Sequence, residues 1–346
     1  MPRRAKIEGP VTQADIARVA GVSRPIVSLA LSGDLRVAEA TRKKVQEIAR
    51  QLNYHPDLNF DARRLAMRQK SNAPRFRTIG VVWSTEYGLI MENSYHRGIL
   101  TGIINQCGRK SLATIIMQIP QETGEMFSRI SLVDGLIMTS PSPFVLDLAR
   151  RTGKPISGIM GLPEMPNVQI DNESAVAMAF EHLRAKGHER IGYFGPHIRT
   201  HDINARERRE AFLRQAGKKG VSLAFMPERF SHYHDDARQW AEESFSALKN
   251  LSALVVYNDL MAIGLIKGLE KQGCRVPRDI SLVSIDNIEE SALFDPQLTT
   301  VGYDLGAMGA AAVDMIEAMI QSPDKLPPRK LLPCHLIERD SVRGGK

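Results

Sequence analysis

The sequence predicts an all-α N-terminal domain of the helix-turn-helix type, followed by an α/β core of two lobes. Apolar residues recur at helical spacing over the first 56 of the 346 residues, and from residue 78 onward apolar runs alternate with helical patterns. Charge marks the same division. Residues 1–70 contain 14 Lys and Arg against 7 Asp and Glu, which is the whole net charge of +7, and the other 276 residues contain 32 of each sign.

The first helix is expected to begin at about Thr12. Thr12 and Asp15 have the spacing of a capping box, in which each residue's side chain bonds the other's backbone N–H. Gly21 then permits a tight turn. The apolar face of this helix is expected at Ile16, Ala17, Val19 and Ala20.

A second helix is expected to follow directly. Ser23 can cap it by accepting a free N–H, and Pro25 suits the first turn, where its missing N–H is not needed. Two short helices joined by a glycine-containing turn form a helix-turn-helix, whose second helix enters the DNA major groove. An ordinary helical hairpin is the alternative. The apolar residues expected to face the first helix are Ile26, Val27, Ala30 and Leu31.

A third helix is predicted over residues 38–52, with Val45, Ile48, Ala49 and Leu52 on one face. It must end before Pro56, because the residue preceding a proline avoids the α region. We therefore expect a helical domain over residues 1–56, a linker over 57–74 and the core over 75–346.

This N-terminal segment resembles the lactose-repressor (LacI/GalR) family of bacterial transcription regulators. The patterns that match are V-T…D-I-A…A-G-V-S…V-S, V-x-x-x-T-R-x-x-V and L-N-Y-x-P. The resemblance continues downstream over nearly the whole chain. The matching residues are Val11, Thr12, Asp15, Ile16, Ala17, Ala20, Gly21, Val22, Ser23, Val27, Ser28, Val37, Thr41, Arg42, Val45, Leu52, Asn53, Tyr54 and Pro56.

The resemblance implies a repressor that binds a near-palindromic double-stranded operator as a homodimer, with a tetramer as the alternative. Arg24 could bond a guanine edge and Leu29 could touch a thymine methyl. Further phosphate contacts are expected from Lys43, Lys44 and Arg68. The DNA-binding residues expected in the helical domain are Thr12, Ser23, Arg24, Pro25, Ser28, Leu29, Arg42 and Tyr54.

The linker resembles the family's hinge segment, which forms a short helix on specific DNA. Its A-R-R-L pattern implies DNA contacts by Arg63 and Arg64, with Leu65 wedged between base pairs in the minor groove. About two more residues than usual separate Pro56 from Leu65. Leu58 or Phe60 is therefore an alternative wedge, and a plain solvated linker is the alternative to a hinge helix.

The core should contain a largely parallel sheet in each lobe, because strands and helices alternate. The resemblance implies a fold like that of a periplasmic sugar-binding protein, with one lobe at about 78–161 and 291–322 and the other at about 162–290 and 323–340. Helices are expected at about 93–109, 143–151, 173–186, 204–217, 235–248, 259–271 and 304–320. Strands are expected at 78–83, 113–118, 133–139, 155–160, 190–195, 253–258 and 280–285.

A ligand should bind beyond the carboxyl ends of these strands, in the cleft between the lobes. Carboxylate, guanidinium and amide groups together suit the hydroxyls of a sugar or related metabolite. Met160 indicates an apolar wall, and a strand-end cap or surface ion pair is the alternative role for each polar residue. The residues expected to bind the effector are Ser84, Met160, Asn204, Arg208, Asn258 and Asp286.

Other functional classes have weaker support in the sequence. The dispersed cysteines Cys107, Cys274 and Cys334 indicate neither a disulfide framework nor a metal knuckle. We expect no cofactor and no enzyme, because no dinucleotide, phosphate-loop, serine-hydrolase or zinc-protease motif is present. We also expect no metal at the histidine-rich segments, whose members are His197, His201, His232, His234, Asp235 and Asp236.

The chain carries no signal-peptide pattern and no apolar run approaching 18 residues, so we expect a cytoplasmic protein without a membrane partner. One further alternative keeps the DNA binding but replaces the small effector with a protein partner on the core.

Overall fold

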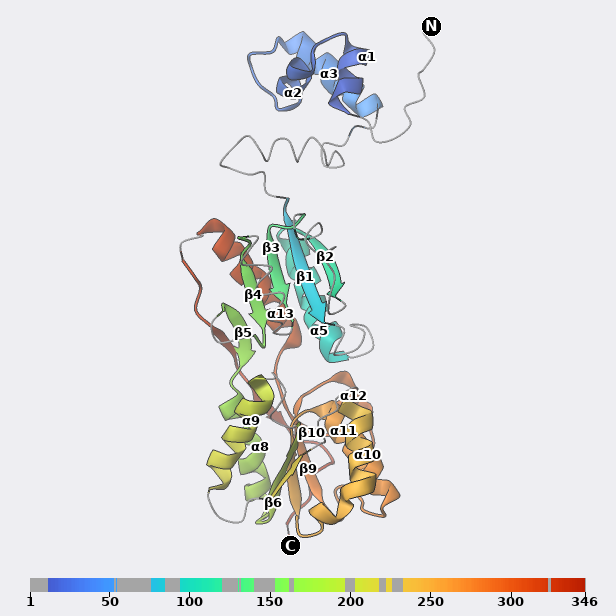
Figure 1. Cartoon of the computed structure of the whole chain (residues 1–346), viewed down its shortest axis with the longest axis vertical. Helices are drawn as coiled ribbons and strands as arrows, with labels where there is room; N and C mark the ends of the chain where they lie inside the picture. Colours follow the sequence, from blue (N-terminus) through green and yellow to red (C-terminus); the bar gives the residue numbers. More distant parts are fainter. Residues whose placement is uncertain are drawn as a thin grey trace. The chain divides into compact units, whose positions relative to one another are not determined.

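The structure is a computed structural model. It describes residues 12–52, 54, 76–84, 94–119, 130, 132–139, 153–161, 165–196, 203–217, 222–225, 233–322 and 325–345. The chain divides into two compact units, Met1–Arg75 and Phe76–Lys346 (Figure 1). The expected hinge residues Leu58, Phe60, Arg63, Arg64 and Leu65 lie outside the described residues.

The N-terminal unit contains three helices, α1 (Gln13–Ala20), α2 (Arg24–Leu31) and α3 (Glu39–Gln51). The predicted capping box at the start of α1 is confirmed. The Thr12 hydroxyl accepts the N–H of Asp15 at 3.3 Å, and the Asp15 carboxylate accepts the N–H of Thr12 at 3.0 Å. Gly21 ends α1 in the left-handed conformation, which a residue without a side chain adopts most easily.

The three helices enclose a small apolar cluster that agrees with most of the predicted face residues. Ile16, Val27, Ala30 and Val45 are buried in it. Two expected members are wrong, because Val19 is 54% exposed and Ile26 is 36% exposed. Each of these helices is only eight residues long, so its buried stripe is narrower than the apolar run in its sequence suggested.

The second unit contains two six-stranded sheets. The strand order is β11-β5-β4-β3-β1-β2 in the first and β12-β10-β9-β8-β6-β7 in the second. Neighbours pair in parallel, apart from β12, which runs antiparallel to β10. The strands of the first sheet are β1 (Thr78–Ser84), β2 (Ala113–Ile119), β3 (Gly135–Met138), β4 (Ile156–Ile159), β5 (Asn167–Ile170) and β11 (Lys330–Leu332).

The second sheet is covered by helices on both faces (Figure 1). Helices α8 (Asn172–Ala185) and α9 (Ile203–Ala216) lie on one face, and α10 (Tyr233–Ser244) and α11 (Asp259–Lys271) lie on the other. The short 3₁₀ helix η4 (Phe245–Leu248) follows α10, and α12 (Glu289–Leu293) follows β9. The strands are β6 (Ile191–Gly195), β7 (Ser222–Phe225), β8 (Ala253–Val256), β9 (Ser281–Asp286), β10 (Thr299–Gly302) and β12 (His335–Ile337).

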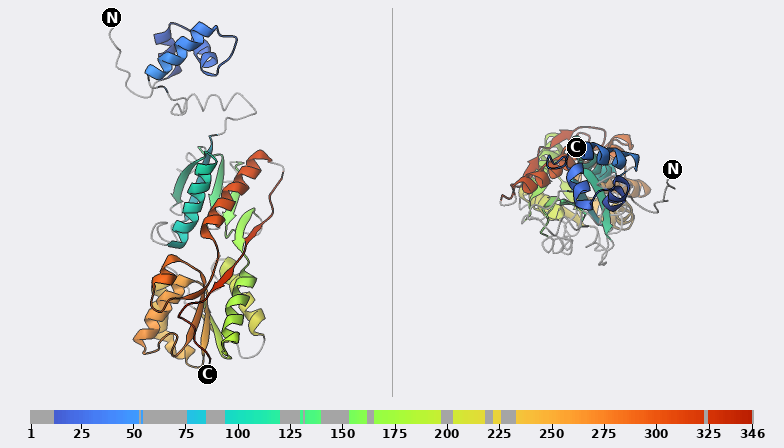
Figure 2. Two further views of the ribbon diagram at one scale, coloured as in Figure 1. Left: turned by 180° about the vertical axis from the view of Figure 1, so that it is seen from behind. Right: turned by 90° about the horizontal axis from the view of Figure 1, so that it is seen from above.

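Helices α5 (Ser94–Arg109) and α13 (Leu305–Gln321) pack side by side in the first lobe (Figure 2). Glycines allow this close approach. A side chain at Gly102 would meet the backbone of Gly306, and one at Gly309 would meet the backbone of Ile99. Within the described residues, no helix is both long and apolar enough to cross a membrane.

Strand pairing corrects the expected lobe limits. The chain passes between the sheets after β5, after β10 and after β11, and not near residues 161, 290 and 322. The strands β5, β10, β11 and β12, and also β7, were not predicted, because each has only three or four residues and polar side chains interrupt the apolar pattern. The expected helix at 143–151 lies outside the described residues, and the other predicted strands and helices are confirmed within a few residues.

Candidate functional site

Helix α2 contains four of the predicted DNA-binding residues, and three of them face solvent. Arg24, Pro25 and Ser28 are exposed. Leu29 is half-buried and packs against the apolar cluster, so only part of its side chain is exposed to touch a thymine methyl as predicted. Ser23 occupies the N-cap position but makes no capping bond, contrary to the expectation. Its hydroxyl is therefore not committed to the helix.

The remaining predicted contacts of this unit differ in exposure. Thr12 and Arg42 are partly exposed, and the Arg42 guanidinium lies 3.5 Å from the carbonyl of Asp34. Tyr54 is only 8% exposed and belongs to the core of the unit, so its ring stabilises packing. Lys43 and Lys44 are exposed, and Lys43 pairs with Glu39 at 2.8 Å.

The second lobe has strained backbone where β9 ends. Asp286, the last residue of β9, has φ 123°, and Asn287 has φ 53°. Met160, directly after β4 in the first lobe, has φ 53°. Residues other than glycine rarely adopt positive φ, and such strain concentrates at functional sites. Two of these three residues, Met160 and Asp286, were predicted from the sequence to bind the effector.

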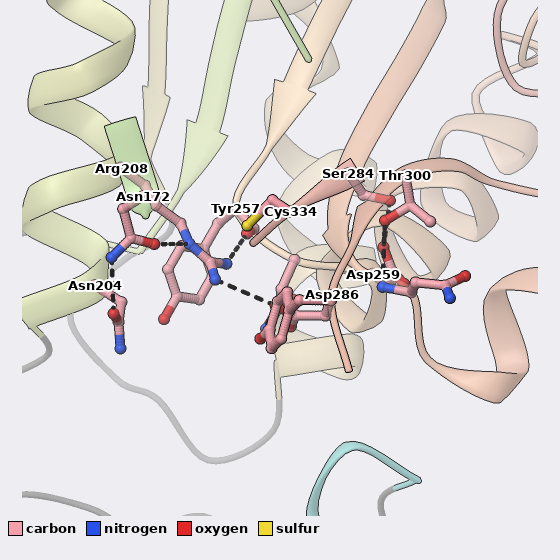
Figure 3. A network of polar contacts seen from close by, with 12 residues as sticks. Asn172, Asn204, Arg208, Tyr257, Asp259, Ser284, Asp286, Thr300 and Cys334 are labelled. Carbon is pink, nitrogen blue, oxygen red and sulfur yellow. Dashed lines mark hydrogen bonds and ion pairs between the residues drawn. The ribbon is translucent and has the colours of Figure 1, made fainter. Parts of the chain in front are cut away.

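Asp286 forms a buried ion pair with Arg208 of α9, at 3.2 Å (Figure 3). The Arg208 side chain is 3% exposed and the Asp286 side chain 9%. Burial opposes the charge of Arg208, but the carboxylate of Asp286 and the phenol groups of Tyr257, Tyr303 and Tyr193 together outweigh it and hold the pKa of Arg208 well above its ordinary value. The structure therefore brings together the two charged residues that the sequence predicted.

Arg208 is fixed from two further directions. Its Nε donates to Oδ1 of Asn172 at 2.9 Å, and its Nη1 donates to the carbonyl of Tyr257 at 2.5 Å. Asn172 also donates to Oδ1 of Asn204 at 3.0 Å, which ties the third predicted residue to the same network. Figure 3 shows this chain of contacts from Asn204 to Asp286. The guanidinium is thereby held in one orientation, as recognition of a polar ligand requires.

Aromatic residues complete the site on the side of the first lobe. The hydroxyl of Tyr303 donates to Oδ1 of Asp286 at 2.9 Å and is also hydrogen-bonded to Tyr95 of α5. The neighbouring His96 packs edge-on against Trp83, with ring centroids 4.5 Å apart. Burial lowers the pKa of His96 to about 4, so its ring is neutral. Its Nδ1 has no hydrogen-bond partner in the described part of the chain.

The side chains of Asn258 and its neighbour Asp259 form hydrogen bonds within the second lobe. Oδ1 of Asn258 accepts the N–H of Met261 and so caps α11, at 2.9 Å. Asp259 is fully buried and accepts hydrogen bonds from Ser284, from Thr300 at 2.7 Å and from the N–H of Ile288 at 2.9 Å. Burial, with a smaller effect of Asp286, raises the pKa of Asp259 to about 7.

Sequence reasoning missed several residues of this site. Asn172 follows the short strand β5 with only Asp171 between them, and that position was an available signal. Tyr95 and Tyr303 carried no such signal, because only folding brings them together. Met160 directly follows β4 and Ser84 is the last residue of β1, so both lie at strand ends as expected. Met160 is buried, and the side chain of Ser84 lies outside the described part of the chain. Of the histidines weighed as metal ligands, only His234 is described, with its Nδ1 3.1 Å from Asp235.

Two families match different parts of the chain. Residues 12–57 match the family described as bacterial regulatory proteins, lacI family. Residues 180–342 match the periplasmic binding protein-like domain. The N-terminal domain of this chain belongs to the lacI family. This confirms the predicted fold class and the predicted function as a DNA-binding regulator of transcription.

Individual relatives resemble this chain over most or nearly all of its length. The HTH-type transcriptional repressor PurR of Photobacterium profundum is 28% identical, over 96% of this chain and 98% of the relative. The crystal structure of the lac repressor dimer bound to operator and the anti-inducer ONPF has a TM-score of 0.75 at 23% identity, over 97% of this chain and 100% of the other. A LacI-family regulator from Enterococcus faecium with bound ribose has a TM-score of 0.66 at 25% identity, over 78% and 100%.

Proposed function

We propose that this protein binds a near-palindromic operator as a homodimer and that a small polyhydroxylated molecule, a sugar or a close relative of one, controls its operator affinity. The buried Arg208–Asp286 pair at the strained end of β9 carries the proposal. A carboxylate accepts hydrogen bonds from hydroxyls, and a guanidinium donates to them. The relative with bound ribose supports the same class of ligand.

The position of the pair explains how a ligand can act on both lobes. Asp286 and Arg208 belong to the second lobe, and Tyr303 connects them to Tyr95 on α5 of the first lobe. The lobes also meet where Arg97 of α5 lies 3.4 Å from Glu289 of α12. A ligand that binds one relative position of the lobes more tightly will shift the population toward it.

A thermal-shift screen against ribose, other sugars and nucleosides tests the effector class, because a ligand of the folded state raises the melting temperature. The informative variant is Asp286→Asn, which keeps an oxygen for Arg208 and Tyr303 but removes the charge. We expect it to lose the ligand-induced shift. Asp279→Asn is the matched control, because Asp279 pairs with Arg278 on the surface. An Asp286→Asn variant with the parental shift would contradict the proposed site.

Dimerisation is supported by two exposed apolar residues on the first lobe. Ile104 of α5 is 47% exposed, and Ile116 of the edge strand β2 is 45% exposed. The side chain of Thr114 in β2 is hydrogen-bonded to Cys107 of α5. Ile116 lies two residues after Thr114 and shares its face of the strand, and Ile104 lies one turn before Cys107 on the helix. Ile104 and Ile116 therefore lie on the same side of the lobe. The lac repressor structure, of the same fold, is a dimer.

Sedimentation of the purified chain tests the dimer. Ile104→Lys combined with Ile116→Lys should produce a monomer, because a charged side chain at a buried apolar contact is strongly unfavourable. Leu326→Lys is the control, since Leu326 is 73% exposed outside this surface. A dimer that survives the double substitution would place the interface elsewhere.

A further inference from the structure

The outward side of α2 is poor in hydrogen-bonding side chains. Its sequence is RPIVSLAL, in which only Arg24 and Ser28 have polar side chains. Val27 and Ala30 are buried, and Leu31 packs against the apolar cluster of the unit. The helix that faces DNA in this family therefore offers two polar side chains and a group of apolar ones.

Two apolar residues of α2 are exposed on its outward side, and a third is partly exposed there. Pro25 is exposed and Ile26 is 36% exposed, and neither belongs to the apolar cluster of the unit. Leu29 packs partly against the apolar cluster, and the part of it that remains exposed shares a face of the helix with Pro25, one turn before it. A single exposed aliphatic residue needs no explanation. Three such residues close together on a recognition helix indicate that the helix recognises an apolar feature of the base pairs.

The major groove contains only one strongly apolar recognition feature. Its base edges carry hydrogen-bond donors and acceptors, and the C5-methyl group of thymine is the apolar exception. Contacts to phosphates position a protein but carry no direct sequence information. Apolar side chains facing the groove can therefore discriminate bases only through that methyl group.

We propose that this protein reads its half-site chiefly through thymine C5-methyl groups, and that Ile26, with Pro25 and Leu29, determines this specificity. Arg24 supplies the main hydrogen-bonding contact to a base edge. The proposal rests on operator binding by α2, and it names the chemistry that the preferred operator must contain. Sequences rich in thymine at two or three positions of each half-site are expected.

The experiment uses the full chain and a preferred operator selected from a pool of random duplexes. Each thymine of the half-site is then replaced by uracil, which removes the methyl group and leaves the hydrogen-bonding edge unchanged. Burial of one methyl group corresponds to about a fourfold change in affinity. We expect a loss of about fourfold for at least two thymines in each half-site.

The Ile26→Ala variant tests whether the Ile26 side chain contacts the methyl group of one particular thymine in the half-site. This variant should bind the thymine operator several-fold more weakly, and at one position it should no longer distinguish thymine from uracil. Its melting temperature should match the parent's, because Ile26 lies outside the apolar cluster. Val19→Ala is the matched control, since Val19 is an exposed aliphatic residue on α1. It should keep the parental preference for thymine over uracil.

Two results would overturn the inference. One is a selected operator on which every uracil substitution is neutral. The other is an Ile26→Ala variant that retains the full preference for thymine at every position. A chain that selects no sequence from the pool would instead contradict operator binding itself, so the two failures can be told apart.

Discussion

The N-terminal unit and the core use charged side chains differently. In the described part of the N-terminal unit, the ion pairs are local, as in Arg18–Asp15 and Lys43–Glu39, and most of the partners are exposed. In the core, Arg208 and Asp286 are 78 positions apart in the sequence and both are buried. Exposed pairs contribute little to stability, whereas breaking a buried pair leaves an uncompensated charge. The core should therefore be far more sensitive to loss of a charge.

The largest effect is expected for Arg208→Ala. It should lower the free energy of unfolding of the core by about 3–5 kcal/mol, because Asp286 would remain buried without its partner. Arg214→Ala on the same helix removes an exposed pair with Glu173 and should destabilise the core far less. Denaturant unfolding measures both variants. Equal losses would show that burial does not separate the two pairs.

The next effect is a pH dependence that comes from Asp259. Its pKa is about 7 when folded and 3.8 when unperturbed, so the folded state keeps a proton that the unfolded state releases between these values. The free energy of unfolding should therefore fall as pH rises from about 4 to 7, by up to about 1.4 kcal/mol per pH unit from this group, and then level off.

Asp259→Asn should remove this contribution, because an amide does not titrate, and unfolding curves at several pH values would show it. Asp279→Asn is the control. A hydrogen bond from Arg278 lowers the pKa of Asp279 below its ordinary value of 3.8. Any pH dependence that Asp279 gives to the free energy of unfolding therefore falls below the pH range in which Asp259 acts. Parallel pH profiles for the parent and Asp259→Asn would show that Asp259 is already ionised in the folded chain at low pH.

A smaller effect is expected at the helix caps of the N-terminal unit. Thr12→Ala removes a capping box and should destabilise α1 by about 0.5–2 kcal/mol. Ser23→Ala removes a hydroxyl that makes no capping bond and should change stability by only a few tenths of a kcal/mol. Hydrogen exchange of the α1 and α2 amides in the full chain measures both. A larger effect at Ser23 would mean that it forms a cap in solution.

The smallest effect is expected at the exposed pair of Glu39 and Lys43, which are 2.8 Å apart. Glu39→Gln should change stability by less than about 0.5 kcal/mol. It should also strengthen DNA binding slightly at low salt, because Lys43 becomes free to contact a phosphate. Binding titrations at two salt concentrations measure this change. An equal gain at both would argue against a phosphate contact by Lys43.

The comparison of the two units also explains which parts of the site could be predicted. Thr12, Asp15 and Gly21 act on neighbours a few residues away, so a sequence pattern contains their whole interaction. Arg208 and Asp286 could be predicted as site residues, but their direct pairing could not. That pairing changes how they can be tested, because alanine at either position removes half of a buried ion pair.

The sequence by itself determined the helix-turn-helix, the basic charge of residues 1–70 and the alternation of strands and helices in the core. These features depend on short-range periodicity, capping and composition. Only the tertiary structure decided the three passages between the lobes, the burial of Asp259 and the contact between Tyr95 and Tyr303. Each of these depends on segments far apart in the chain, whose packing sets burial and hydrogen bonding and leaves no local pattern in the sequence.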